Sequence, residues 1–276
     1  MTSINLRAMA TAKLSLKILA CEIAQREICF AAAQTPHLLE VEFLPVGHHD
    51  EPRKGHRDLQ ARIDAVPAGR YDAILVGYGL CSLMLSGLTA GHTRLVVPRA
   101  HDCITLFLGS KERYSQLFQS CPGTYYFTAG WLEFPQRKTV RSAGLDALRE
   151  MTDDIGSQTT PFGLGQSFAD LLAKYGEENA RYLLEVTQQW ADHYDRGALI
   201  SFDCTAQLGL RDRVKDICEK RGWQFDELAG DLGLLQRWLG GQWDDREFLI
   251  VQPQQSVYPS YNDQVIEARP VTGENS

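Results

Sequence analysis

Three chemically versatile side chains follow one another in the stretch PRAHDCITLFLGS: His101, Asp102 and Cys103. A cysteine thiolate can act as a nucleophile or bind a metal, and an imidazole can act as a base or as a further ligand. An apolar run follows directly, so Asp102 is predicted to cap a helix that starts at Cys103. The triplet would then sit where a strand gives way to a helix.

Cysteines also follow other predicted strands. Cys21 closes the apolar run LKILAC, and Cys81 follows the strand of YDAILVGYG in the turn GYGLCS. Because the carboxyl ends of parallel strands meet at one edge of a sheet, we expect Cys21, Cys81 and Cys103 to lie close together. Thiolates bind zinc and iron–sulfur clusters, and His49 of HHDEP or His101 could complete the ligand set. These residues predict a metal site, although cysteine is also a common core residue.

Five further residues are predicted to contact a cofactor or a small-molecule substrate: Gly77, Tyr78, Gly79, Arg99 and Thr105. The glycines of the turn could bring backbone amides close to an anion, and Arg99 could bind a carboxylate or phosphate with two hydrogen bonds. Alternatively, the glycines form a tight turn that positions Cys81, and Arg99 pairs with an acid at the end of its strand. No phosphate-binding loop signature is present, so the pattern indicates no particular nucleotide.

Two other functions remain open from these residues. Cys103 could be a nucleophile with His101 or His49 as its base and no metal, although no local signature of a cysteine hydrolase is present. The chain could also be a non-catalytic protein that binds a small acid or docks on a partner protein. The residues therefore do not decide whether the chain is an enzyme.

The composition is that of an ordinary globular protein, with 276 residues of which 44% are hydrophobic and a net charge of -7. An acidic chain without a cluster of lysines and arginines argues against nucleic acid or an anionic membrane as partner. No apolar run approaches the roughly 20 residues of a membrane span, and Glu22 interrupts the first apolar stretch. Seven scattered cysteines fit a reducing compartment, so we expect a cytoplasmic protein.

The elements that must position these side chains alternate between apolar strands and amphipathic helices on both sides of an irregular middle. This alternation predicts an α/β fold with two Rossmann-like lobes and mostly parallel sheets, or else one doubly wound sheet with a helical insertion. One helix is expected over 104–120, at most a short helix near 145–151, and two helices broken at Gly176. The predicted boundaries are a loose leader over 1–14, a first α/β lobe over 15–131, an irregular and helical connecting segment over 132–195, a second α/β lobe over 196–254 and a polar tail over 255–276.

Six blocks of the chain carry a resemblance to a known family: ILACE, LPVGHHDEP, YDAILVGYGLCS, LVVPRAHDCITLFLGSKERY, GTYYFTAGWLE and AGDLGLLQRWLGGQWDDREFLIVQP. These blocks resemble domain-of-unknown-function family 1638 of bacteria and archaea. The positions that match the family are Cys21, His49, Cys81, His101, Asp102 and Cys103. Similar proteins are commonly found beside corrinoid-dependent methyltransferases and their reactivating proteins. The resemblance therefore implies a role in one-carbon or methylamine-type metabolism, with a methyltransferase or a corrinoid protein that holds the corrinoid as partner.

Overall fold

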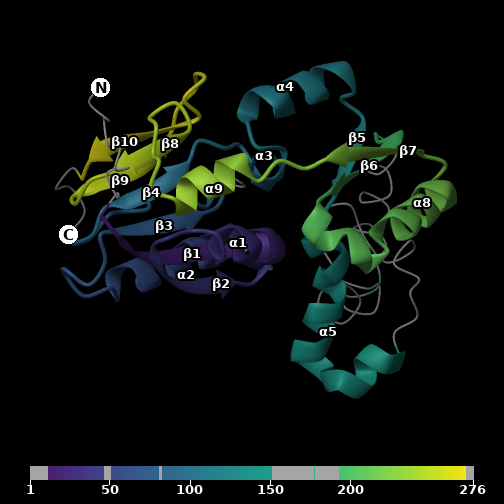
Figure 1. Cartoon of the computed structure of the whole chain (residues 1–276), viewed down its shortest axis with the longest axis horizontal. Helices are drawn as coiled ribbons and strands as arrows, with labels where there is room; N and C mark the ends of the chain where they lie inside the picture. Colours follow the sequence, from purple (N-terminus) through teal and green to yellow (C-terminus); the bar gives the residue numbers. More distant parts are fainter. Residues whose placement is uncertain (1–11, 47–50, 81–82, 151–176, 178–192, 272–276) are drawn as a thin grey trace, which may run out of the picture.

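The computed structural model describes residues 12–46, 51–80, 83–150, 177 and 193–271. The strands in these ranges form a five-stranded sheet, a three-stranded sheet and a two-stranded hairpin, with helices between the strands (Figure 1). The two larger sheets are parallel apart from one strand, so the predicted α/β fold class with mostly parallel sheets is confirmed. No helix within the described ranges is long and apolar enough to cross a membrane.

The five-stranded sheet has the strand order β2-β1-β3-β4-β8, and only β8 runs antiparallel to its neighbour. Its strands are β1 (Ser15–Cys21), β2 (Leu38–Leu44), β3 (Ala73–Gly77), β4 (Leu95–Pro98) and β8 (Phe248–Val251). Every residue of β3 and β4 is buried, which is typical of parallel strands covered on both faces. The edge strand β2 instead carries Glu40 and Glu42, which form ion pairs with Lys17 of β1.

Helices cover both faces of this sheet. They are the 3-10 helix η1 (Glu22–Ala24) and the α-helices α1 (Gln25–Ala32), α2 (Pro52–Asp64) and α9 (Gly233–Leu239). The chain moves from β1 to β2 in one direction and then returns past β1 to β3, so right-handed crossovers place α1 and α2 on opposite faces. α9 packs against α1, and its buried Trp238 donates a hydrogen bond from Nε1 to the Val96 carbonyl at 3.2 Å. The boundary between β1 and β3 is therefore the switch point of a doubly wound sheet.

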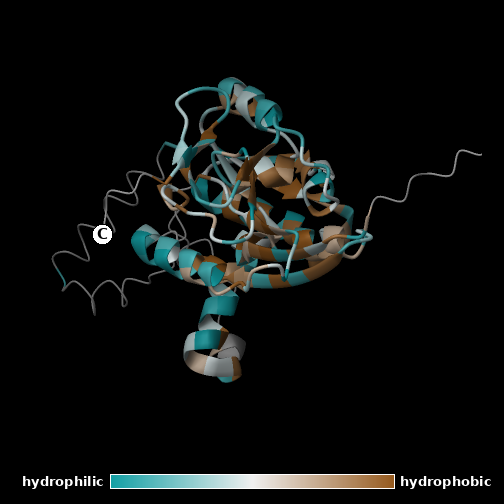
Figure 2. Cartoon of the chain, turned by 90° about the vertical axis from the view of Figure 1, so that its left-hand side faces the viewer, coloured by the Kyte–Doolittle hydropathy of each residue, from teal (hydrophilic) through white to brown (hydrophobic). Residues whose placement is uncertain are grey.

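The three-stranded sheet is parallel and has the order β5-β6-β7. Its strands are β5 (Thr124–Phe127), β6 (Arg196–Ser201) and β7 (Gln224–Ala229), accompanied by α5 (Ala129–Glu150), the 3-10 helix η4 (Asp203–Leu208) and α8 (Leu210–Arg221). α8 packs on β6 and β7 over a small core that includes Phe127, Leu199 and Val214. Figure 2 shows hydrophobic residues concentrated in the interior strands and hydrophilic residues on outward-facing helices.

The three-stranded sheet is inserted in the chain between two strands of the five-stranded sheet. After β4 the chain passes through α3 (Cys103–Leu108) and α4 (Lys111–Ser120) to β5, and after β7 it returns through α9 to β8 (Figure 1). Two strands therefore lie outside the lobes predicted for them. β5 was expected with the first lobe and β8 with the second. The apolar pattern of a strand identifies the strand but not its partner, because the partner can be distant in sequence.

The polar tail predicted from residue 255 is a structured hairpin as far as residue 270, so this prediction is wrong. The hairpin consists of the antiparallel strands β9 (Gln255–Pro259) and β10 (Ile266–Pro270). Main-chain hydrogen bonds join it to the loop before β4, including Gly87 N to the Val257 carbonyl at 2.7 Å. Val257 and Ile266 are fully buried. These single apolar residues in a polar stretch carry too weak a pattern to predict a docked hairpin.

Two helix predictions also need correction. The helix expected over 104–120 is split, because Gly109 in the left-handed conformation ends α3 and the Ser110 side chain caps α4. The segment after Trp131 was expected to hold at most a short helix near 145–151. A helical stretch does follow Gly144 up to Glu150, but α5 is already helical from Ala129 to the non-helical backbone of Gly144. Its apolar residues follow no sustained helical period, which is why the pattern missed it. The two helices predicted around Gly176 and most of the leader lie outside the described residues.

Candidate functional site

Cys21 lies at the switch point of the five-stranded sheet. It is the last residue of β1, and its neighbour Ala20 pairs in register with Gly77, the last residue of β3. The Cys21 side chain is buried, with 2% of the residue exposed. Open α/β sheets bind ligands in the crevice outside the carboxyl ends of their strands at the switch point. The structure thus places one of the predicted metal ligands where this type of sheet offers a site.

The glycine-rich turn after β3 is packed tightly against its surroundings. A Cβ atom on Gly77 would lie 2.7 Å from the Cβ of Ala20, and one on Gly79 would lie 2.5 Å from the Cα of Asp102. Tyr78 between them is 2% exposed. The glycines are therefore required for the close approach of the turn to β1 and to the His101–Cys103 segment, whatever ligand they also contact.

The same contact brings two of the predicted cysteine-bearing segments together. Leu80 N donates a hydrogen bond to the Ala100 carbonyl at 2.8 Å, so the turn that leads to Cys81 is tied to the turn that leads to Cys103. Cys81 itself and His49 lie outside the described residues. The structure therefore joins the turns that lead to Cys81 and Cys103, and the ligand set itself stays a prediction.

Asp102 caps α3, as the sequence predicts. Its Oδ1 accepts a hydrogen bond from Ile104 N at 3.0 Å, and its Oδ2 accepts one from the Tyr114 hydroxyl at 2.9 Å. Burial raises the pKa of the Asp102 carboxyl even though these hydrogen bonds favour its charged form. Burial and the neighbouring Asp102 also raise the pKa of Tyr114. Tyr114, from α4, is a member of this edge that the sequence pattern did not reveal.

The neighbours of Asp102 differ in their exposure. Cys103 is the first residue of α3 and is buried, with 8% of the residue exposed, whereas His101 is exposed. Cys103 therefore belongs to the core side of this turn and His101 to its solvent side. A His101–Cys103 pair that acts as base and nucleophile stays a prediction.

Glu22, directly after Cys21, is a buried carboxylate that was not among the predicted site residues. It accepts hydrogen bonds from Val46 N at 2.8 Å and from Arg141 Nη1 at 2.9 Å, and Arg141 Nη2 contacts its second oxygen. Burial alone would raise the pKa of Glu22, but the bonds from Arg141 and Val46 outweigh it and hold the pKa below its usual value. The sequence offered one signal for this residue, because Glu22 is an acid that interrupts an apolar run at the end of a strand.

The carboxyl ends of the second sheet meet the same edge. Gly130, at the start of α5 after β5, approaches η1 so closely that an added Cβ would collide with the Ile23 carbonyl. After β7, Asp231 N donates a hydrogen bond to the Phe107 carbonyl of α3 at 2.9 Å. Arg141 of α5 completes this arrangement through its ion pair with Glu22. Segments that follow strands of the second sheet therefore contact Glu22 and Ile23, directly after Cys21, and the end of the helix that begins at Cys103.

Glu27 of α1 is a second buried acid at this junction. It is 0% exposed, and neither carboxylate oxygen has a hydrogen-bond partner on another described residue. Burial, with a contribution from Glu133, raises its pKa to about 7. The nearby cations do not fully compensate the negative charge of Glu27, because Arg26 and Arg137 bind the carboxylate of Glu133 instead. Glu27 shares a helical face with Ile23 and Ala31, and a charged residue on such a face signals a buried acid.

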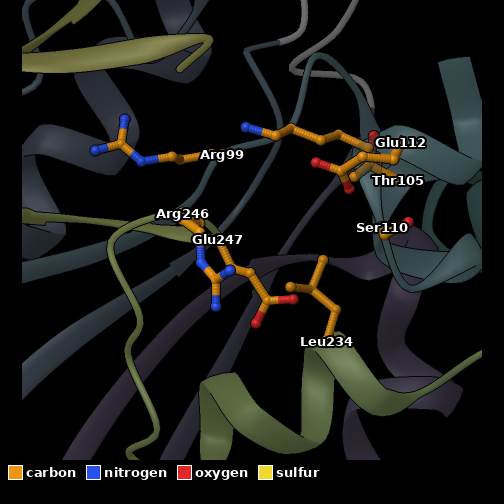
Figure 3. Close-up of a pocket in the computed structure, with 8 residues that line it drawn as sticks. Arg99, Thr105, Ser110, Glu112, Leu234, Arg246 and Glu247 are labelled. Atoms are coloured by element: carbon orange, nitrogen blue, oxygen red, sulfur yellow. The ribbon is translucent and has the colours of Figure 1, made fainter. Parts of the chain in front are cut away.

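Arg99 and Thr105, two of the predicted ligand-binding residues, line a pocket of about 280 Å³ beside α3 (Figure 3). The Arg99 guanidinium points away from Thr105, as Figure 3 shows. It donates to the Asp245 carbonyl at 2.6 Å, to the Asp245 carboxylate at 2.9 Å and to the carbonyls of Gln264 and Ile266. The donors of Arg99 therefore bind the loop before β8 and the β9–β10 hairpin rather than face a ligand. This fits the alternative prediction that Arg99 pairs with an acid.

The described residues alone contain no group of three or more histidine, cysteine, aspartate or glutamate side chains that could hold a metal ion. Cys81 and His49 lie outside these residues, so the four-ligand site stays a prediction. Of its members, the structure places Cys21 and Cys103 at the same sheet edge, both buried.

A family model described as "Protein of unknown function (DUF1638)" matches residues 43–239, which is more than half of the chain. The matched range includes the glycine-rich turn after β3, the His101–Cys103 triplet and the inserted three-stranded sheet. No curated protein and no solved structure matches the chain.

Proposed function

The chain belongs to the DUF1638 family, and from this premise we propose that it binds zinc or an iron–sulfur cluster at the carboxyl edge of its five-stranded sheet. Cys21 and Cys103 would supply two thiolates, and Cys81 with His49 or His101 would complete the ligand set. The observation that supports this proposal most is the convergence of the cysteine-bearing segments. Cys21 ends β1, Cys103 starts α3, and the turn that leads to Cys81 is hydrogen-bonded to the turn that leads to Cys103.

The chemistry of these donors fits such a metal. Thiolates are preferred ligands of zinc and of iron–sulfur clusters, and both described cysteines are shielded from solvent. A thiol buried in an apolar sheet edge stays protonated unless a metal or a cation compensates the thiolate charge. Zinc bound here would polarise a substrate or activate a thiol. The surrounding chain would hold the ligands and keep water away from the site.

We further propose that this site serves corrinoid-dependent methyl transfer or another branch of one-carbon metabolism. The support for this role is that similar proteins are commonly found beside corrinoid-dependent methyltransferases. The partners would be a small-molecule substrate and a methyltransferase or corrinoid protein that holds the corrinoid. This part of the proposal is an association and is tested separately, by co-purification with a corrinoid protein.

Metal content of anaerobically purified protein tests the metal site. We expect about one equivalent of zinc, or of an iron–sulfur cluster with its visible absorption, and its loss in Cys21→Ala, Cys81→Ala and Cys103→Ala. Cys121→Ala is the matched control, because Cys121 follows α4 away from this edge and its loss should leave the metal content unchanged. Less than about half an equivalent in the wild type would overturn the proposal, as would equal loss in the control variant.

A further inference from the structure

A second site lies beside α3, on the pocket of about 280 Å³ that Thr105 lines. This volume lies just below the roughly 300–1,000 Å³ of sites for drug-sized molecules, so it suits a smaller ligand. The pocket lies between the start of α4 and the loop that precedes β8 (Figure 3). The lining residues that matter below are Thr105, Ser110, Lys111, Glu112, Arg246 and Glu247.

Thr105 presents an unused hydroxyl at the wall of this pocket. The residue is 1% exposed, and its Oγ1 has no hydrogen-bond partner among the described residues. A buried hydroxyl without a partner costs free energy, so such groups in native proteins usually have a role for which the cost is tolerated. A ligand that accepts or donates one hydrogen bond inside the pocket would remove this cost.

The start of α4 makes the pocket favourable for negative charge. Ser110 caps this ten-residue helix, and Ser110, Lys111 and Glu112 of its first turn line the pocket. The free backbone N–H groups and the dipole of a helix N-terminus attract anions. Lys111 adds an ammonium group, which among the described residues donates one hydrogen bond, to the Asp263 carbonyl at 2.5 Å. It retains N–H donors for a ligand.

The other charged side chains limit the ligand to a single negative charge. Both oxygens of Glu247 are bound by Arg237 at 2.6 Å, so this carboxylate is already neutralised. Arg246 pairs with Asp244, but its side chain is 87% exposed, and an exposed pair of this kind is weak enough to exchange for a ligand. Glu112 contributes one negative charge. Lys111 and Arg246 together with Glu112 therefore leave a net charge of about +1 in the pocket. A monoanion balances this charge, whereas a phosphate dianion exceeds it.

We propose that this pocket binds a small monocarboxylate, with the Thr105 hydroxyl, the Lys111 ammonium and the Arg246 guanidinium as donors. The site is separate from the proposed metal site, and neither proposal requires the other. It gives Thr105 a role in ligand binding and leaves Arg99 as the residue that fixes the far wall of the pocket.

NMR titration of the full-length protein with acetate and propionate, at constant ionic strength, tests this site. Saturable shifts of the Thr105 and Lys111 amides are expected, and succinate and inorganic phosphate should bind more weakly than either monocarboxylate. Thr105→Val should reduce the affinity for propionate about tenfold, because a hydrogen bond to a charged group is lost. Its stability to urea should be unchanged or higher, because the unpartnered hydroxyl is gone.

Two matched variants separate binding from folding. Thr205 is an equally buried threonine, but its hydroxyl donates to the Phe202 carbonyl at 3.1 Å, so Thr205→Val should lose stability and keep propionate affinity. Lys111→Met should reduce the affinity for propionate about tenfold, and Lys54→Met on α2 should leave this affinity unchanged. The proposal is overturned if neither monocarboxylate gives saturable shifts, if phosphate or succinate binds more tightly, or if Thr105→Val destabilises the protein or binds like the wild type.

Discussion

At the scale of single residues, two buried glutamates at the junction of the sheets show how local charge decides titration. Glu22 is bound by Arg141 and its pKa lies below the usual value, whereas Glu27 has no such partner and its pKa is raised to about 7. Burial acts in the same direction on both, so the difference comes from the cation that only Glu22 contacts. Glu27 is therefore expected to destabilise the fold when it is ionised.

The first prediction concerns Glu27 and pH. A carboxyl that titrates near 4.5 when unfolded and near 7 when folded binds more protons in the folded state between these values. Its contribution to stability is thus complete below about pH 4.5 and is lost as the pH rises through 7. At about 1.4 kcal/mol per pKa unit, the loss is roughly 3 kcal/mol. Glu27→Gln should therefore exceed the wild type in urea stability at pH 8 by up to this amount, with the difference shrinking toward pH 5.

Glu133→Gln provides a control of opposite sign. Burial would raise the pKa of Glu133, but hydrogen bonds from Arg26 and Arg137 hold it below its usual value. This variant should be less stable than the wild type at pH 8, and the deficit should narrow in acid. If the Glu27→Gln variant had the same stability to urea as the wild type at every pH, ionisation of Glu27 would not destabilise the folded protein.

The candidate site was predictable to the extent that its signals are local. The Asp102 cap follows from an acid placed directly before an apolar helical run, and the structure confirms it. The partner of Arg99 was not predictable, because Asp245 lies 146 positions away. Tyr114 was missed for a related reason. Its bond to Asp102 depends on the break at Gly109, which turns α4 back toward the start of α3.

At the scale of elements, the buried strands were predictable and their partners were not. β1, β3 and β4 are short apolar runs, and runs of this kind are typical of parallel strands covered on both faces. β8 has the same apolar character, but it pairs antiparallel with β4 and closes the first sheet. The part of α5 before Gly144 was missed because it contains a proline at position 135, a residue that is unfavourable inside a helix.

The second prediction concerns the contact between α5 and η1. Because a methyl group at Gly130 would collide with the Ile23 carbonyl, Gly130→Ala must displace the start of α5 from the edge that carries Cys21. Overpacking of this kind costs about 1–3 kcal/mol, which urea unfolding would detect. Gly91→Ala is the matched control, since its Cβ would meet only the Asp64 carboxylate at 4.0 Å and should change stability by less than about 0.5 kcal/mol. Equal stabilities of the two variants would contradict the close contact.

At the scale of the whole molecule, the two sheets share one core although each has its own helices. The larger cluster of buried side chains joins Leu16 and Val76 of the first sheet to Tyr126, Ala198 and Ile200 of the second. The chain also crosses between the sheets twice, once through α3 and α4 and once before α9. The α/β class with mostly parallel sheets followed from the sequence, but this shared core did not, because it depends on which strands the insertion separates.

The third prediction is that both sheets unfold together. Trp238 is fully buried over the first sheet, and Trp223 packs against the smaller core of the second. Two variants, one with Trp238 and the other with Trp223 as its single tryptophan, should each show a fluorescence transition in urea that coincides with the circular dichroism transition of the same variant, because the shared core and the two crossings couple the sheets. A fluorescence midpoint that differs from the circular dichroism midpoint of the same variant would show that the insertion unfolds on its own.

The late return of β8 has a consequence for biosynthesis. One edge of β4 is exposed from the time it leaves the ribosome until Phe248–Val251 is made, about 150 residues later. At roughly 5–20 residues per second, the nascent sheet waits on the order of ten seconds with an unpaired apolar edge strand. Such an edge can pair with another nascent chain. The yield of soluble protein in a host cell should therefore depend on chaperones and on translation speed more than on the stability of the finished fold.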